Sequence, residues 1–236
     1  MRRRGTPARG VVGAGRINWR EPRARGVVGA TLAIIVILAG AAGPAWGQRA
    51  IPEAAYQYKR AATSIWGDEL GNRIPRAILA AQVHQESTWR ASARSPFAYG
   101  LTQFTPDTAE DMCRWYPELR PCDPGDYRWA LRAQAIYMRR LLDMNRVGRP
   151  AASDLDAIAF ALSGYNGGPG WTMRDRNECR DYGDLCNDGR WFCNVEHYHG
   201  ASPSGARRNQ ASRNENRHYV RIILVDLQET YRSAGW

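Results

Sequence analysis

The sequence predicts an all-α, mainly helical protein with a single domain behind an N-terminal leader. Three observations carry this prediction. Apolar residues recur at helical spacing in successive segments. Several of these segments begin with a proline, which suits the first turn of a helix. No run of convincing length alternates apolar and polar residues as a β-strand would. With 236 residues, 44% of them hydrophobic, the chain is long enough to bury a sizeable core.

The expected helices follow from their start signals and apolar spacing. Pro52, Pro75 and Pro106 each open a segment with helical periodicity. Asp154 or Ser153 can cap a short apolar helix, because the side-chain oxygen of either residue can accept a backbone N–H of the first turn. The expected helices cover residues 52–66, 75–90, 106–116, 127–145, 155–163 and 216–232.

Residues 172–214 differ in composition from the rest of the chain. They are rich in Arg, Asp, Asn, Gly and Ser, contain three cysteines and show no helical periodicity. A loop of this length is usually functional or disordered. We expect an irregular insertion held together by its cysteines, within a domain that covers residues 48–236.

The charge of the chain is concentrated in its leader. Residues 1–47 hold eight arginines and one acid, a net charge of +7, which leaves +3 of the total of +10 for the rest. An apolar run follows at 27–42, and Ala45-Trp46-Gly47 resembles a small-residue cleavage site. We expect residues 1–47 to be a signal peptide that sends the protein to the periplasm or cell envelope.

The alternative is that the leader stays as a membrane anchor, although spanning a bilayer takes about 20 apolar residues and this run is shorter. Membrane contact is expected only through this segment, if it is not cleaved. Because most of the basic charge belongs to the leader, a nucleic-acid-binding protein is disfavoured.

The cysteines fit an exported protein, since disulfides form in oxidising compartments. Cys113 and Cys122 bracket a short loop that contains proline, which a disulfide could close. The remaining cysteines are odd in number, so one thiol is left over or pairs between chains. Zinc binding with two nearby histidines is the alternative, but the seven-residue cysteine intervals do not match familiar zinc sites. These remaining residues are Cys179, Cys186, Cys193, His197 and His199.

One carboxyl group is placed where it is expected to hold a proton. At 100° per residue, Glu86 lies on the same helix face as Leu79 and Val83, near the helix C-terminus. Apolar surroundings and the negative end of the helix dipole both disfavour the carboxylate, so its pKa should be raised. Such a group can serve as a general acid in glycosidic cleavage. The alternative is that Glu86 faces water at the edge of the core.

Four segments extend this interpretation: HQESTWRASARSP, AYGLTQFTPDTAEDM, ALSGYNGGPGW and ENRHYVRII, in this order. Together they resemble the soluble lytic transglycosylase (SLT) domain of peptidoglycan-cleaving enzymes, which is related in fold to goose-type lysozyme. The resemblance covers residues 70–225, interrupted by 172–214. It departs from the family pattern in two places: SPFAYGL is one residue short, and Asn216 replaces the usual threonine.

The resemblance implies a lysozyme-like fold and a set of roles. Glu86 would be the single catalytic acid and then base, without a metal or an organic cofactor. The 6-hydroxyl of N-acetylmuramic acid would attack in place of water and give a 1,6-anhydromuramyl product. Residues expected to line the glycan groove are Ser95, Gln103, Tyr165, Asn166 and Glu215.

The function expected from this resemblance is a peptidoglycan lytic transglycosylase that cleaves the β-1,4 bond between N-acetylmuramic acid and N-acetylglucosamine. Its partner would be the glycan strand, and no nucleic acid is expected. Two alternatives remain open. One is a muramidase-type hydrolase on the same fold. The other is a non-catalytic wall-binding component of a trans-envelope secretion or conjugation machine, which the segment 172–214 favours.

Overall fold

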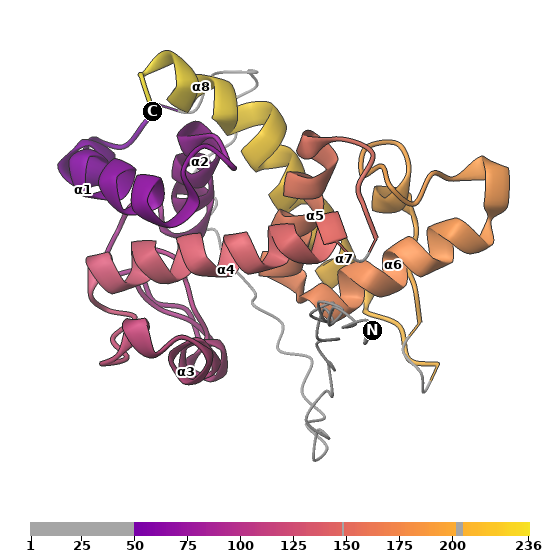
Figure 1. Ribbon diagram of the computed structural model, residues 1–236, viewed down its shortest axis with the longest axis horizontal. Helices are drawn as coiled ribbons and strands as arrows, with labels where there is room; N and C mark the ends of the chain where they lie inside the picture. Colours follow the sequence, from indigo (N-terminus) through magenta and orange to yellow (C-terminus); the bar gives the residue numbers. More distant parts are fainter. Residues whose placement is uncertain (1–49, 148, 202–204) are drawn as a thin grey trace, which may run out of the picture. The chain divides into compact units, whose positions relative to one another are not determined.

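The computed structural model describes residues 50–147, 149–201 and 205–236. Helices dominate this part of the chain, and within it no β-strand forms apart from isolated bridges of Tyr99 to Arg94 and Phe104 (Figure 1). The prediction of an all-α protein is confirmed. The α-helices are α1 (Glu53–Leu70), α2 (Arg76–Ser87), α3 (Pro106–Trp115), α4 (Tyr127–Val147), α5 (Asp154–Gly167), α6 (Pro169–Asp181), α7 (Gln210–Arg221) and α8 (Gln228–Ser233).

The helix starts follow the expected signals closely. Pro52 and Pro75 occupy the capping positions that precede α1 and α2. Pro106 is the first residue of α3, and the Thr105 hydroxyl before it accepts a backbone N–H three residues on, at 3.2 Å. Of the two candidate caps of α5, Ser153 takes the role, with a corresponding bond of 3.1 Å. These bonds satisfy donors that the first turn of a helix leaves free.

Helix α2 lies at the centre of the core, between α1 and the C-terminal helical run (Figure 1). Its alanines allow neighbouring backbones to approach closely, and each large apolar side chain fully buried contributes about 1.5–3 kcal/mol. Helix α4 packs against α1 on one side and α5 on the other. The buried residues of α2 are Ala77, Ile78, Leu79, Ala80, Ala81, Gln82, Val83, His84 and Ser87.

The C-terminal helix is longer than predicted and changes its winding. Helix α7 continues into a π-helical stretch, η4 (Ile222–Leu227), and then into α8. Single π-turns of this kind are found inside α-helices, often at functional sites. Here the wider winding turns Ile222, Ile223 and Leu227 inward, and η4 packs against α2.

The segment 172–214 is more ordered than its composition predicts. Helix α6 reaches Asp181, and α7 begins at Gln210, so the irregular part covers 182–209 with the short turns η2 (Gly183–Leu185) and η3 (Val195–His197). The buried positions of α6 recur at helical spacing but hold polar side chains, which conceals the periodicity in the sequence. These buried residues are Thr172, Asp175, Arg176 and Cys179.

The polar interior of α6 is stable because its charges are paired or hydrogen-bonded. The Asp175 carboxylate accepts from Arg208 at 2.7 Å and from Arg217 at 2.9 Å. The fully buried Arg176 guanidinium donates to the Asn145 side chain and to the backbone carbonyls of residues 149, 150 and 188. Buried charges are tolerated when every partner is present. These contacts tie the irregular part of the segment to the helical core.

The cysteines form two disulfides. Cys113 is bonded to Cys122, as the short loop between them suggested, and Cys179 is bonded to Cys186. Cys193 remains as an exposed free thiol. The second disulfide uses two of the three cysteines weighed for zinc. In the described ranges, no group of three or more His, Cys, Asp or Glu side chains is arranged to hold a metal ion.

The predicted signal peptide, residues 1–47, lies outside the described residues. Within the described part of the chain, none of the helices combines the length and the apolar character needed to cross a bilayer.

The pairing of the cysteines predicts one reactive thiol per chain. A thiol assay of the unreduced, denatured protein should give one thiol, and reduction should raise the value to five, the number of cysteines in the sequence. In the folded protein an alkylating agent should modify Cys193, because it is exposed. The variant Cys193→Ser should give no thiol before reduction. A value of three thiols in the parent would mean that one of the two disulfides is absent.

Candidate active site

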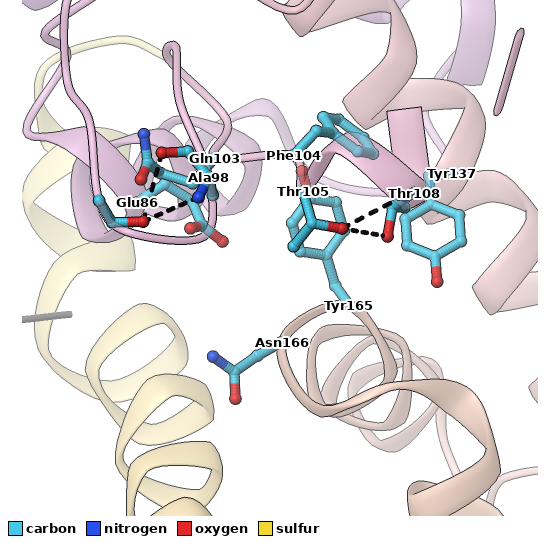
Figure 2. A pocket seen from close by; sticks show the side chains of 10 residues that line it. Glu86, Ala98, Gln103, Phe104, Thr105, Thr108, Tyr137, Tyr165 and Asn166 are labelled. Atoms are coloured by element: carbon cyan, nitrogen blue, oxygen red, sulfur yellow. Dashed lines mark hydrogen bonds between the residues drawn. The ribbon is translucent and has the colours of Figure 1, made fainter. Parts of the chain in front are cut away.

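A pocket opens where the end of α2, the loop 95–105 and the end of α5 meet (Figure 2). Glu86 provides the sole carboxyl group among the described residues that line it. The lining is otherwise apolar, aromatic or hydrogen-bonding without charge, which suits a neutral polar ligand. The residues that line the pocket are Glu86, Ser95, Ala98, Gln103, Phe104, Thr105, Thr108, Tyr137, Tyr165 and Asn166.

Glu86 occupies the last turn of α2, next to the buried residues of that helix. The pKa of its carboxyl group is raised from 4.5 to about 8, chiefly by burial, while a hydrogen bond from Tyr219 lowers the pKa and the nearby negative charge of Glu215 raises it. Removal of water is the largest of these effects, because an apolar environment penalises the charged form. The carboxyl group is therefore mostly protonated at neutral pH, as its place on the apolar face predicted.

Tyr219 of α7 holds the carboxyl group in place. Its hydroxyl donates to Glu86 Oε1 at 2.5 Å, and the side chain of Tyr219 is 1% exposed. Tyr219 lies in the segment ENRHYVRII, from which the sequence alone predicts no role for it. The signal was present, since Tyr219 lies one helical turn after Glu215 and faces the same way.

Ser95 and Gln103 line the pocket, but their hydrogen bonds are directed to their own loop. The Ser95 hydroxyl accepts from the backbone N–H of Ala98 at 2.9 Å and donates to its carbonyl at 3.2 Å. The Gln103 amide donates to the carbonyls of Ala93 and Gly100, at 3.2 and 2.8 Å. Both side chains thus shape the loop that is one residue shorter than the family pattern. Such local bonds take the place of a regular backbone ladder.

Tyr165 forms the aromatic wall of the pocket. Its ring packs against Phe104 and Tyr137, with centroids 5.6 and 5.4 Å apart. Its hydroxyl donates to the carbonyl of Thr102 at 2.9 Å. Burial raises the pKa of this hydroxyl, and the charge of Glu86 adds to the effect. Tyr165 therefore stays neutral and presents its ring rather than a charge.

Asn166 and Glu215 lie together at the edge of the pocket. The Asn166 side chain hydrogen-bonds to the Glu215 carboxyl group, whose pKa is raised by burial and lowered by this bond. Glu215 itself is not part of the pocket lining. The structure thus brings five of the six predicted site residues to one pocket, with Glu215 behind Asn166.

Asn216 braces the turn that carries Tyr165 and Asn166. It is fully buried, its Oδ1 accepts from the Ser163 hydroxyl at 2.8 Å, and its Nδ2 donates to Asn166 Oδ1 at 2.9 Å. A Cβ on Gly167 would come within 2.8 Å of Asn216 and 2.5 Å of Arg208, so the turn needs glycine at this point. The residue that departs from the family pattern is a buried support of the site.

Comparison with known proteins shows the family of this chain. A family model described as "Transglycosylase SLT domain" matches residues 65–184, more than half of the chain. The chain belongs to this family, and its lysozyme-like, all-α fold class is confirmed. Glu215 and Tyr219 lie beyond the matched residues.

One curated relative is named "Membrane-bound lytic murein transglycosylase F", from Mannheimia succiniciproducens. It is 33% identical over 107 residues, which cover 45% of this chain and 20% of the relative. The chain thus spans about a fifth of the length of this relative.

The raised pKa of Glu86 predicts a pH-dependent gain of stability in Glu86→Gln. The folded state holds the proton up to a pKa of about 8, whereas the unfolded state releases it near 4.5. The stabilising contribution of this group is complete below pH 4.5 and is lost as the pH rises through 8. The glutamine variant should therefore be the more stable protein at neutral pH, and its advantage should grow from pH 5 to 8.

The limit of this effect is about 1.4 kcal/mol per pH unit, which the partial access of solvent to the carboxyl group reduces. Denaturant unfolding of both proteins at several pH values measures it. The exposed Glu110→Gln is the matched control and should show no such trend. An advantage that does not change with pH would mean that Glu86 is ionised throughout.

Proposed function

We propose that this protein is a peptidoglycan lytic transglycosylase that cleaves the β-1,4 bond between N-acetylmuramic acid and N-acetylglucosamine and forms a 1,6-anhydromuramyl product. One observation carries the proposal: a single carboxyl group, with a pKa raised to about 8, lines an otherwise uncharged pocket. Membership of the SLT family and the murein enzyme among its relatives support it.

The chemistry needs one group that first gives and then takes a proton. Protonated Glu86 would donate to the glycosidic oxygen as the bond to N-acetylmuramic acid breaks. The resulting carboxylate would remove the proton from the 6-hydroxyl of the same sugar, whose oxygen then attacks the anomeric carbon. An attacking group within the substrate has a high effective concentration, so no second carboxylate has to activate water.

The rest of the pocket would orient the sugar. The Tyr165 ring offers a flat apolar surface, on which pyranose rings pack well. Ser95 and Gln103 would act through the shape of their loop, and the free side of the Asn166 amide could contact the glycan. Through these roles the pocket residues would bind the substrate and hold it in place.

A muramidase-type hydrolase is the second candidate, and Glu215 favours it. A second carboxylate near the acid is what hydrolysis by an activated water requires. Glu215, however, is engaged by Asn166 and does not line the pocket. The transglycosylase is therefore the better account of the geometry.

We further propose that the protein works outside the cytoplasm, on glycan strands of the cell wall. Two disulfides suit an oxidising compartment. The alternative of a wall-binding component of a trans-envelope machine draws support from the exposed Tyr182 and Leu185 in the irregular part of 172–214. Exposed apolar side chains of this kind can contact a partner protein.

Replacing the acid tests the proposal directly. We expect Glu86→Gln to lose at least about 100-fold in kcat on purified peptidoglycan, because the amide cannot donate a proton and then accept another. Release of soluble muropeptides measures the rate, and Glu110→Gln should match the parent. Full activity in Glu86→Gln would place catalysis elsewhere, and a parent that binds peptidoglycan without cleaving it would favour the wall-binding alternative.

The products distinguish the two reactions. Mass spectrometry of the digest should find muropeptides that end in 1,6-anhydromuramic acid, lighter by one water than the products of hydrolysis. Borohydride should leave these products unreduced, because they have no reducing end. Products that all carry a reducible muramic end would show a hydrolase instead.

A further inference from the structure

A chain of four hydrogen bonds runs through the core and ends at Glu86. Trp66 Nε1 donates to Gln134 Oε1 at 3.1 Å, and Gln134 Nε2 donates to Gln82 Oε1 at 2.9 Å. Gln82 Nε2 donates to the Tyr219 hydroxyl at 3.1 Å, which in turn donates to Glu86 Oε1. The four residues that precede Glu86 are at most 1% exposed. Four helices thus contribute to one buried polar line, in α1, α4, α2 and α7.

The direction of this line is determined at its far end. An indole N–H can only donate, so Trp66 requires the amide oxygen of Gln134 to face it. The amide nitrogen of Gln134 then faces the Leu79 carbonyl at 3.2 Å, which can only accept, and Gln82. Gln82 therefore also presents its oxygen to Gln134. Neither amide can be reversed without opposing two donors or two acceptors in the core.

The same logic determines the role of the tyrosine. The amide nitrogen of Gln82 faces the Tyr219 hydroxyl and the Met138 sulfur, which is a weak acceptor, at 3.8 Å. The Tyr219 oxygen thus accepts from Gln82, and its single proton is directed to Glu86 Oε1. Tyr219 acts as a donor to the carboxyl group in both of its protonation states.

A fixed donor favours one place for the acidic proton. The carbonyl oxygen of a carboxylic acid is a better acceptor than its hydroxyl oxygen, so the bond from Tyr219 favours Oε1 as the carbonyl oxygen and Oε2 as the oxygen that carries the proton. Oε2 makes no hydrogen bond within the described ranges and is not one of their buried unpaired atoms, so solvent in the pocket can reach it. A substrate oxygen in the pocket would meet the atom that carries the proton.

We propose that Trp66, Gln134 and Gln82 are positioning residues that force the Tyr219 hydroxyl to donate to Oε1 and so keep the transferable proton of Glu86 on Oε2, facing the substrate. This inference rests on the proposed function, in which Glu86 is the general acid. The three residues do not line the pocket, so they act on the proton rather than on binding.

The line of hydrogen bonds also opposes the effect of burial on the pKa of Glu86. A Tyr219 hydroxyl that accepts from Gln82 is a stronger donor, because consecutive hydrogen bonds polarise one another. Of the other titratable groups around the carboxyl, Glu215 on α7 works against its ionisation, whereas Tyr165 on α5, with Tyr137 of α4 beyond it, stays neutral because burial raises its own pKa. Loss of the Gln82 donor should therefore raise the pKa of Glu86 further.

The test is a double-mutant cycle with Gln82→Met and Tyr219→Phe. Titration by carbon-13 NMR of glutamate-labelled protein follows Glu86, whose signal is identified by its absence in Glu86→Gln. We expect Gln82→Met to raise the pKa by about half a unit in the parent and to add nothing in Tyr219→Phe, because its effect passes through the hydroxyl. On peptidoglycan, kcat should fall about tenfold with KM unchanged, since the proton would be shared between both oxygens.

Two further variants keep the result independent of folding defects. Trp66→Phe keeps a ring but removes the N–H that sets the direction, and should shift the pKa the same way by a smaller amount. Ile158→Val on α5 is the matched control, because it also changes a buried side chain but lies on a helix that contributes no member of the line. It should lower the melting temperature without moving the titration.

The proposed role of the line would be overturned if Gln82→Met left the pKa of Glu86 unchanged. An equal shift in the parent and in Tyr219→Phe would overturn it as well. The titration needs no substrate, so it separates the two proposals. The parent protein could release no anhydro products while Gln82→Met still shifted the pKa of Glu86 only when Tyr219 is present. That result would contradict the proposed function and support the proposed role of the line.

Discussion

The carboxyl group of Glu86 lies at the end of a helix that is buried on nearly every side and reaches solvent only at the pocket, and the other features of the site are arranged around this burial. Helix α2 can pass through the core because its alanines let α1, η4 and α8 approach it. A carboxyl group in its last turn meets apolar surroundings and the negative end of the helix dipole. The same burial that stabilises the fold therefore keeps the Glu86 carboxyl group protonated at the pocket.

Two networks of buried polar groups among the described residues support the site. The line of hydrogen bonds from Trp66 to Tyr219 reaches the Glu86 carboxyl group itself. Around α6, Asp175 binds Arg208 and Arg217 and so holds the irregular part of 172–214 on the core. Because Arg208 also contacts the turn at Gly167, that segment supports the wall of the pocket as well as offering exposed side chains outside.

Much of the fold was predictable, since its signals are local. Caps and prolines marked the starts of α1, α2, α3 and α5 within a residue or two, as at Ser153 and Pro106. Helix α6 was missed because its inward positions hold Asp175 and Arg176, whose partners lie on distant segments. In the site, the place of Glu86 on the apolar face could be read directly, whereas Tyr219 could not be assigned a role without knowing that α7 crosses the end of α2.

The sequence by itself determined most of the helices, the short loop that Cys113 and Cys122 could close and the apolar setting of Glu86, because all of these depend on residues within a few turns of one another. Only the tertiary structure decided which two of the last three cysteines pair and that Ser95 and Gln103 bond to their own loop. The tertiary structure alone also revealed the line of hydrogen bonds that ends at the Glu86 carboxyl group. Periodicity records which face of a helix avoids water, but the choice of a hydrogen-bond partner depends on which segments meet in space.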